Sequence, residues 1–296
     1  MTRLIIGEID FLNCLPLFTR LQKGGGSRDD WQFVKGDPAR LNGCLAAGSI
    51  DISPSSSMEY ALRSSRYFLF PRLAISSHRE VQSVIFLSRQ PLEKLRPGTI
   101  ALTSQSLTSV YLLQLILFHF HRYEPDDFTF TTGEIQPFTA DSPAALVIGD
   151  QALHLYHRPP AGFRVYDLGA LWYRFTGLPF VYALWIGNRR ALDSGDKEEQ
   201  LRELHRQLLA DKSRLPRFFP DLLELTDRLY PRLSREVILN YWQRAISYDL
   251  GPRELAGLRL FYRLAHENRL LAAVPRLSFF PDDPQARTAA EAIPGQ

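Results

Sequence analysis

Residues 48–60 read GSIDISPSSSMEY, a short apolar strand that runs directly into hydroxyl side chains at a predicted helix start. Two isoleucines alternate with polar neighbours in the strand, and apolar residues then follow at helical spacing. The first amides of such a helix have no partner and lie at the positive end of the helix dipole. One serine could serve only as the helix cap. Because Ser55, Ser56 and Ser57 are consecutive, we predict that this turn binds a carboxylate.

A second stretch repeats this arrangement further along the chain. Residues 99–102 are apolar with strand composition, and an amphipathic helix begins a few residues later. The polar side chains between them are Thr103, Ser104, Gln105, Ser106 and Thr108. Two hydroxyl-rich helix starts that each follow a strand predict two anion sites in two similar halves of the protein.

Length and composition describe an ordinary globular protein. The chain has 296 residues, of which 45% are hydrophobic, enough for one large or two medium domains. Its 35 basic and 32 acidic residues are spread along the sequence, so we do not expect nucleic acid as a partner. The opening MTRLIIGE and the short apolar runs indicate neither a secretory signal nor a membrane anchor. With two cysteines no disulfide framework is needed, and we expect a cytoplasmic location.

The order of the predicted elements indicates an α/β fold with two lobes. Strands and helices alternate up to about residue 187, and four amphipathic helices follow from residue 193. The carboxyl ends of the strands would face a shared cleft. We predict that the chain crosses between the lobes at 82–88 and 180–187. The predicted division is lobe 1 at 1–88 plus 187–275, lobe 2 at 89–186, and a disordered tail at 276–296.

Several motifs, in this order, resemble the chorismate dehydratase family of menaquinone biosynthesis. In the first half they are IGEIDFLNCLP at 6–16, GDPARLN at 36–42 and the opening stretch at 48–60. In the second half they are ALTSQS at 101–106, IGD at 148–150, DLG at 167–169 and TGLPF at 176–180. The matches extend over about residues 4–187, with a weaker match to about 270, and Phe11 stands where a tyrosine is common in that family.

The resemblance implies a fold like the type 2 periplasmic solute-binding proteins, in which two lobes close over a ligand. It also implies that the fold is used here as an enzyme. Chorismate would lose water to give 3-[(1-carboxyvinyl)oxy]benzoate, the first step of the futalosine route to menaquinone. No metal and no organic cofactor is implied.

Chorismate has two carboxylates and a hydroxyl that must leave as the ring becomes aromatic. We assign the two hydroxyl-rich helix starts to the carboxylates, leaving open which start binds which. Asn13 and Ser83 are polar residues at cleft-facing strand ends, and the resemblance supports both as candidate catalytic residues that orient the reacting hydroxyl. Because an amide is not a strong base, the proton would go to the enolpyruvyl carboxylate of the substrate or to water. Asp150 is a further candidate for substrate binding, although it and Glu59 are most simply interpreted as structural partners.

Two alternatives stay open at this point. This fold usually only captures small solutes, so the chain could be a non-catalytic cytoplasmic binder of a small carboxylate. The related 1,4-dihydroxy-6-naphthoate synthase has a similar fold, but its opening motif, Ser-Pro-Cys-Pro-Asn-Asp, is absent where residues 10–16 of this chain read DFLNCLP. The sequence makes no prediction of the oligomeric state.

Overall fold

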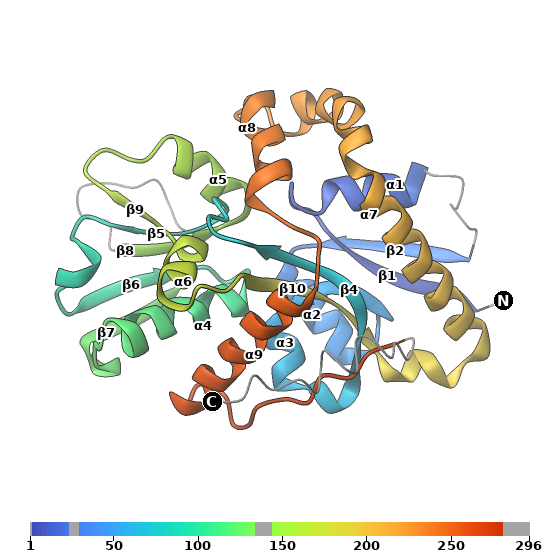
Figure 1. Cartoon of the computed structure of the whole chain (residues 1–296), viewed down its shortest axis with the longest axis horizontal. Coiled ribbons are helices and arrows are strands. Elements are labelled where there is room, and N and C mark those ends of the chain that lie inside the picture. The colour runs from blue at the N-terminus through green and yellow to red at the C-terminus, as the bar shows by residue number, and fades with distance from the viewer. Residues whose placement is uncertain (1, 24–29, 134–143, 281–296) are drawn as a thin grey trace.

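The computed structural model describes residues 2–23, 30–133 and 144–280, which form two lobes lying side by side (Figure 1). Each lobe is built on one five-stranded sheet, ordered β2-β1-β3-β10-β4 in the first lobe and β7-β6-β8-β5-β9 in the second. The strands of the first sheet are β1 (Leu4–Ile9), β2 (Trp31–Gly36), β3 (Ile52–Ser56), β4 (Tyr67–Ser77) and β10 (Phe180–Asn188). Those of the second are β5 (Val84–Ser88), β6 (Gly98–Leu102), β7 (Phe128–Thr132), β8 (Ala144–Ile148) and β9 (Arg164–Asp167).

The two sheets have the same design, which confirms the predicted α/β fold with a doubled pattern. In the first sheet β1 pairs in parallel with β2 and β3, and β10 runs antiparallel between β3 and β4. In the second sheet β6 pairs in parallel with β7 and β8, and β5 runs antiparallel between β8 and β9. In both sheets the antiparallel strand is the one along which the chain arrives from the other lobe.

The predicted lobe boundaries place two strands in the wrong lobe. The prediction put residues 84–88 in the first lobe and residues 180–186 in the second. Residues 84–88 form β5 of the second sheet, and residues 180–188 form β10 of the first. The chain therefore passes between the sheets at 78–83 and 177–179, and the predicted lobe boundaries differ from the strand pairing by these two strands. The sequence could not locate the boundaries because an apolar strand looks the same whichever sheet it joins.

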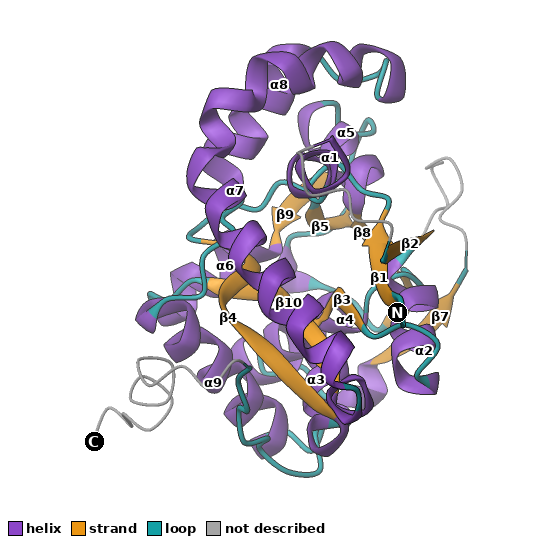
Figure 2. Cartoon of the chain, turned by 90° about the vertical axis from the view of Figure 1, so that its right-hand side faces the viewer, coloured by secondary structure: helices purple, strands orange, loops and turns teal. Residues whose placement is uncertain are grey.

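Helices cover both sides of each sheet. In the first lobe α7 packs on α1 along one side of the sheet, and α2 and α3 pack on the other (Figure 2). Helix α2 is capped at both ends, since the Asp37 side chain accepts a hydrogen bond from Arg40 N at 2.9 Å and Gly48 ends the helix at a φ of 77°. The helices are α1 (Leu15–Lys23), α2 (Pro38–Ala47), α3 (Ser57–Leu62), α4 (Leu107–Leu115), α5 (Gly149–His157), α6 (Leu168–Thr176), α7 (Gly195–Leu229), α8 (Arg235–Asn240) and α9 (Pro252–Glu267).

Helix α7 is a single 35-residue helix. It takes the place of the first two of the four amphipathic helices that the sequence predicted from residue 193 onward. Pro216 and Pro220 lie inside it, and each removes one backbone hydrogen bond. Leu215, Phe219 and Leu222 are nevertheless all buried. Burial of one continuous apolar face therefore outweighs the helix-breaking tendency of the prolines. None of the helices in the described part of the chain is long and apolar enough to cross a membrane.

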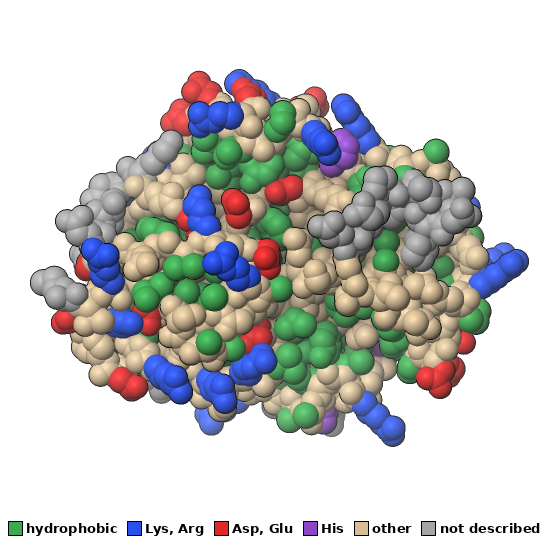
Figure 3. All heavy atoms as spheres, turned by 180° about the vertical axis from the view of Figure 1, so that it is seen from behind, with side chains coloured by type: hydrophobic (Ala, Val, Ile, Leu, Met, Phe, Trp, Pro, Cys, Tyr) green, Lys and Arg blue, Asp and Glu red, His purple; other side chains and the backbone are tan. Residues whose placement is uncertain are grey.

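The lobes share a hydrophobic core near the second crossing. Trp172 of α6, Phe180 of β10 and Phe261 of α9 are buried, and their ring centroids lie 4.9–6.2 Å apart in edge-to-face contacts. On the outer surface seen in Figure 3, basic and acidic side chains are interspersed, so this face carries no extended field of one sign.

Part of the predicted disordered tail lies against the first sheet. Leu69 N of β4 donates to Ser278 O at 2.8 Å, and Phe280 N donates to Leu69 O at 2.9 Å. Residues 276–280 are thus held as an extended segment beside β4, because the strand at the sheet edge offers unpaired backbone groups. The remainder of that tail, 281–296, lies outside the described residues.

Candidate active site

A cavity of about 60 Å³ lies between the two sheets, where the first crossing meets the turn before α1 and the starts of several helices. Six of its fourteen described lining residues carry a hydroxyl or an amide, the other eight are apolar or glycine, and none of the fourteen has a charged side chain. The lining residues are Ile9, Asn13, Pro38, Ser56, Ile75, Val81, Ser83, Val84, Ser106, Ser109, Ile148, Gly149, Tyr182 and Ala183. Of the predicted site residues, the structure therefore brings Asn13, Ser56, Ser83 and Ser106 together in one wall.

Four helices begin at this cavity. Pro38 is the first residue of α2, Ser56 precedes α3, Ser106 caps α4 and Gly149 opens α5. The start of a helix carries a partial positive charge and amide hydrogens that need acceptors. The cavity can therefore attract anions although none of the described residues that line it is cationic.

The two hydroxyl-rich helix starts, predicted to hold separate carboxylates, are bonded to each other. Thr108 N donates to Ser56 Oγ at 3.1 Å, and Met58 N donates to Thr108 Oγ1 at 3.2 Å. The Thr108 hydroxyl also lies 2.5 Å from Ser56 Oγ and 3.2 Å from Ser57 Oγ. These contacts tie the first lobe to the second beside the cavity, and they leave Ser57 and Thr108 outside the lining.

Helix α4 has a second serine at its start that the sequence did not single out. Ser106 Oγ accepts from Ser109 N at 3.3 Å and lies 2.9 Å from Ser109 Oγ, and both residues line the cavity. Thr103 instead accepts from Gln105 N at 3.1 Å, within its own turn. The remaining predicted residues lie outside the lining: Ser104 and Gln105 are exposed, and Ser55 is fully buried in β3, where its hydroxyl has no partner among the described residues.

Asn13 belongs to a turn that is fixed by contacts of the backbone. Leu12 N donates to Asp150 Oδ1 at 3.0 Å, and Leu12 O accepts from Trp242 Nε1 at 2.9 Å. Asn13 O accepts from the Tyr248 hydroxyl at 2.7 Å. The side-chain Oδ1 of Asn13 is buried at the cavity and has no partner among the described residues. The turn thus presents the Asn13 amide to a ligand.

Ser83 is the last residue of the first crossing. Its amide donates to Val81 O at 2.6 Å, and its carbonyl accepts from Gly149 N at 2.8 Å. Gln82, just before it, has a φ of 60°, a backbone conformation that residues other than glycine rarely adopt. The Ser83 hydroxyl lines the cavity and accepts a hydrogen bond from Tyr241 at 2.8 Å.

The two candidate acids occupy different positions. Glu59 accepts from Arg63 and from Tyr67, each at 2.7 Å, which confirms its interpretation as a structural partner. Asp150 lies behind the Asn13 turn rather than in the cavity wall. Burial raises the pKa of Asp150 from 3.8 to about 6, against the lowering effect of the Leu12 hydrogen bond.

Asp150→Asn is expected to stabilise the chain at neutral pH. The folded state raises the pKa of Asp150 from 3.8 to about 6. The buried carboxyl therefore costs no stability below pH 3.8, where it is protonated in both states. The free energy of unfolding falls as the pH rises from there through about 6, because ionisation favours the unfolded state. Asparagine avoids this loss and can still accept from Leu12 N. We expect a gain in unfolding free energy of up to about 3 kcal/mol at pH 7.5 and of about 1 kcal/mol at pH 4.5. Urea unfolding of both proteins at the two pH values measures it, and a pH-independent difference would contradict it.

Sequence reasoning missed the tyrosines around the site. Tyr182 lines the cavity from β10. Tyr241 and Tyr248, in the segment that follows α8, contact two residues of its wall, Ser83 and Asn13. In the sequence, the two C-terminal tyrosines are indistinguishable from the buried face of an amphipathic helix. Only their position in space identifies them.

The chain matches a family model and curated proteins over most of its length. The model, described as menaquinone biosynthesis, matches residues 4–267. The chain is similar to the chorismate dehydratase of Thermus thermophilus, with 30% identity over 275 residues that cover 87% of this chain and 93% of that protein. It is similar to the chorismate dehydratase of Campylobacter jejuni, with 30% identity over 183 residues that cover 61% of this chain and 66% of that protein.

Solved structures with little sequence identity share the fold. A protein from Archaeoglobus fulgidus superposes with a TM-score of 0.72 at 16% identity, covering 91% of this chain and 98% of its own. The alkanesulfonate-binding protein SsuA from Xanthomonas axonopodis, bound to MOPS, has a TM-score of 0.67 at 15% identity, covering 92% and 94%. The periplasmic nitrate-binding protein NrtA from Synechocystis has a TM-score of 0.67 at 13% identity, covering 99% and 89%. The fold is therefore that of the periplasmic binding proteins, as the sequence predicted.

Proposed function

The chain belongs to the menaquinone-biosynthesis family, and we propose that within this family it is a chorismate dehydratase. It is then a hydro-lyase that eliminates water from chorismate to give 3-[(1-carboxyvinyl)oxy]benzoate. The names of the curated relatives favour neither a non-catalytic binder nor 1,4-dihydroxy-6-naphthoate synthase.

The main support for chorismate as the substrate is the composition of the cavity wall. Four helices begin at the cavity, and its described wall has hydroxyls and an amide but no charged side chain. Chorismate is a dianion with a largely apolar ring. Hydroxyl hydrogens and helix dipoles favour its carboxylates, and the isoleucine and valine side chains of the wall suit the ring. Three hydroxyls in the wall, those of Ser56, Ser106 and Ser109, are our candidates for carboxylate contacts.

Three further residues of the two predicted sets, Ser57, Thr103 and Thr108, support these positions rather than contact the substrate. Ser57 and Thr108 hold the two helix starts together, and Thr103 shapes the turn before α4. Asp150 holds the Asn13 turn through Leu12 N.

Elimination removes a ring proton and the hydroxyl on the neighbouring carbon, and aromatisation supplies the driving force. The protein has to orient the substrate, exclude water and stabilise charge on the departing oxygen. We assign the last task to the hydrogens of the Asn13 amide nitrogen Nδ2 and of the Ser83 hydroxyl, two residues that line the same cavity. Asn13 Oδ1 can accept from the hydroxyl of the substrate before it leaves. Since the described wall holds no carboxylate or imidazole, the proton acceptor is the enolpyruvyl carboxylate of the substrate or a water.

We further propose that the product enters the futalosine route and that the reaction takes place in the cytoplasm. Both cysteines of the chain are free thiols, Cys14 buried and Cys44 partly buried, which fits a reducing compartment.

Incubating the purified, metal-stripped chain with chorismate tests the function. We expect ultraviolet absorbance of an aromatic product and, by mass spectrometry, the loss of one water. Chorismate that binds and stays intact would indicate a binding protein instead. A chain that does not bind chorismate would contradict both the function and the carboxylate contacts.

A further inference from the structure

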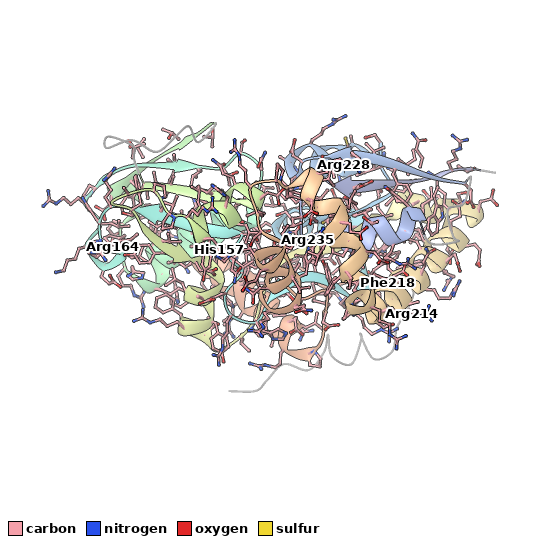
Figure 4. The ribbon with its side chains drawn as sticks, turned by 90° about the horizontal axis from the view of Figure 1, so that it is seen from above. His157, Arg164, Arg214, Phe218, Arg228 and Arg235 are labelled. Atoms are coloured by element: carbon pink, nitrogen blue, oxygen red, sulfur yellow. The ribbon has the colours of Figure 1, made fainter. Side chains whose placement is uncertain are left out.

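Two tyrosines in the segment after α8 hold the two candidate catalytic residues. The Tyr241 hydroxyl donates to Ser83 Oγ at 2.8 Å, and the Tyr248 hydroxyl donates to the backbone oxygen of Asn13 at 2.7 Å. Seen from above, α8 with Arg235 lies between α5 with His157 and α7 with Phe218 and Arg228 (Figure 4). The chain that leaves α8 therefore descends between the lobes (Figure 1), which brings Tyr241 to the first crossing.

The direction of the Tyr241 hydrogen bond follows from its burial. Tyr241 is only 1% exposed, and burial raises the pKa of its hydroxyl well above the usual value, so the hydroxyl keeps its hydrogen. A buried hydroxyl hydrogen needs an acceptor. Within the described part of the chain, the acceptor that lies within hydrogen-bond distance is Ser83 Oγ. Tyr241 is thus the donor.

This direction determines what the Ser83 hydroxyl can do. A serine hydroxyl has one hydrogen to donate and lone pairs to accept with. One lone pair of Ser83 Oγ is occupied by Tyr241, while its own hydrogen has no acceptor among the described residues. Because the side chain is buried and lines the cavity, that hydrogen is available to a ligand there.

We propose that Tyr241 is a positioning residue of the dehydration: by donating to Ser83 it turns the Ser83 hydrogen toward the hydroxyl that leaves the substrate. The inference rests on the proposed function. In this step the ring C–H bond breaks and its electron pair forms the new ring double bond. The C–O bond breaks with its pair on oxygen, and that oxygen, hydrogen-bonded by Ser83, ends as water with the proton removed from the ring.

Without the Tyr241 hydroxyl, Ser83 Oγ–H is no longer held in one orientation and can rotate among its staggered positions. The productive orientation is then less populated, while the contacts to the substrate carboxylates are unchanged. We expect Tyr241→Phe to lower kcat by about tenfold and to change KM by less than about twofold.

A double-mutant cycle tests this with chorismate as substrate and the full chain. Tyr241→Phe, Ser83→Ala and the double variant are compared with the unmodified chain. If Tyr241 acts through Ser83, the tyrosine substitution lowers kcat in the unmodified background and causes no further loss when Ser83 is already alanine. Tyr60→Phe is the matched control, because its buried hydroxyl donates to Arg276 O at 2.9 Å, away from the cavity. It should lose stability similarly and keep its kcat.

Two outcomes would overturn the positioning role alone: an unchanged kcat for Tyr241→Phe, or an equal loss with and without the Ser83 hydroxyl. Melting temperatures of all variants show whether a loss of kcat reflects unfolding, and a fall in kcat that Tyr60→Phe shares would mean a structural role. An unmodified chain that does not dehydrate chorismate would instead overturn the proposed function and the inference with it.

Discussion

Replacing Asn13 with alanine is expected to remove nearly all turnover, lowering kcat by about 10²- to 10³-fold, as removal of a preorganised hydrogen-bonding group at a reacting oxygen does. Asn13 Oδ1 is buried at the cavity without a partner among the described residues, so its hydrogen-bonding capacity is left for the ligand. The chorismate assay measures the loss. Binding of chorismate should weaken far less than kcat falls, because the carboxylate contacts lie elsewhere.

The same substitution is expected to leave the fold intact. The turn is held through Leu12 N, Leu12 O and the backbone oxygen of Asn13, none of which alanine changes. Asn268→Ala is a matched control, since that half-buried amide donates to Leu264 O at 2.7 Å at the end of α9, and turnover should be unaffected. A large loss of thermal stability in Asn13→Ala would show instead that the residue is structural.

Local features of the site were predictable because their signals are local. The strand 4–9 followed by a turn, the Asp37 and Gly48 caps and the polar start of α4 each depend on neighbouring residues, and all are present in the structure. The doubled order of strands then predicted two lobes. Asn13 and Ser83 were predicted from their places at cleft-facing strand ends, with support from the resemblance to a family. Both residues line one cavity.

Contacts between distant segments could not be predicted in the same way. Nothing in the sequence around Tyr241 distinguishes a core tyrosine from one that reaches Ser83, 158 residues away. Nor does the pattern of Ser56 and Thr108 reveal that these hydroxyls contact each other across the lobes, because each helix start could equally hold a carboxylate of its own. Such pairings depend on how the lobes pack, and a serine-rich helix start is compatible with either partner.

The importance of the contact between lobes is testable through Thr108→Val, which keeps the shape of the side chain and removes its hydroxyl. Met58 N loses its acceptor, and Ser56 and Ser57 lose a hydroxyl partner. An unsatisfied buried donor costs about 2 kcal/mol, which corresponds to about 30-fold in the equilibrium between joined and separated lobes. We expect kcat/KM for chorismate to fall by about that factor, mainly through KM, and small-angle scattering to show a larger radius of gyration.

Thr226→Val separates this effect from the general cost of burying valine in place of threonine. Thr226 is as fully buried as Thr108, but its hydroxyl donates to Leu223 O at 2.8 Å within α7, far from the contact between lobes. Its variant should keep both kcat/KM and the radius of gyration. If Thr108→Val behaves like this control, the hydroxyl bridge does not join the lobes, and other contacts, such as those around Leu12 and Ser83 and the shared aromatic core, hold them together. If the substitution opens the lobes as expected, the main role of the serine-rich turn is to hold the two lobes together through Thr108. Of its three consecutive serines, only Ser56 then also lines the cavity.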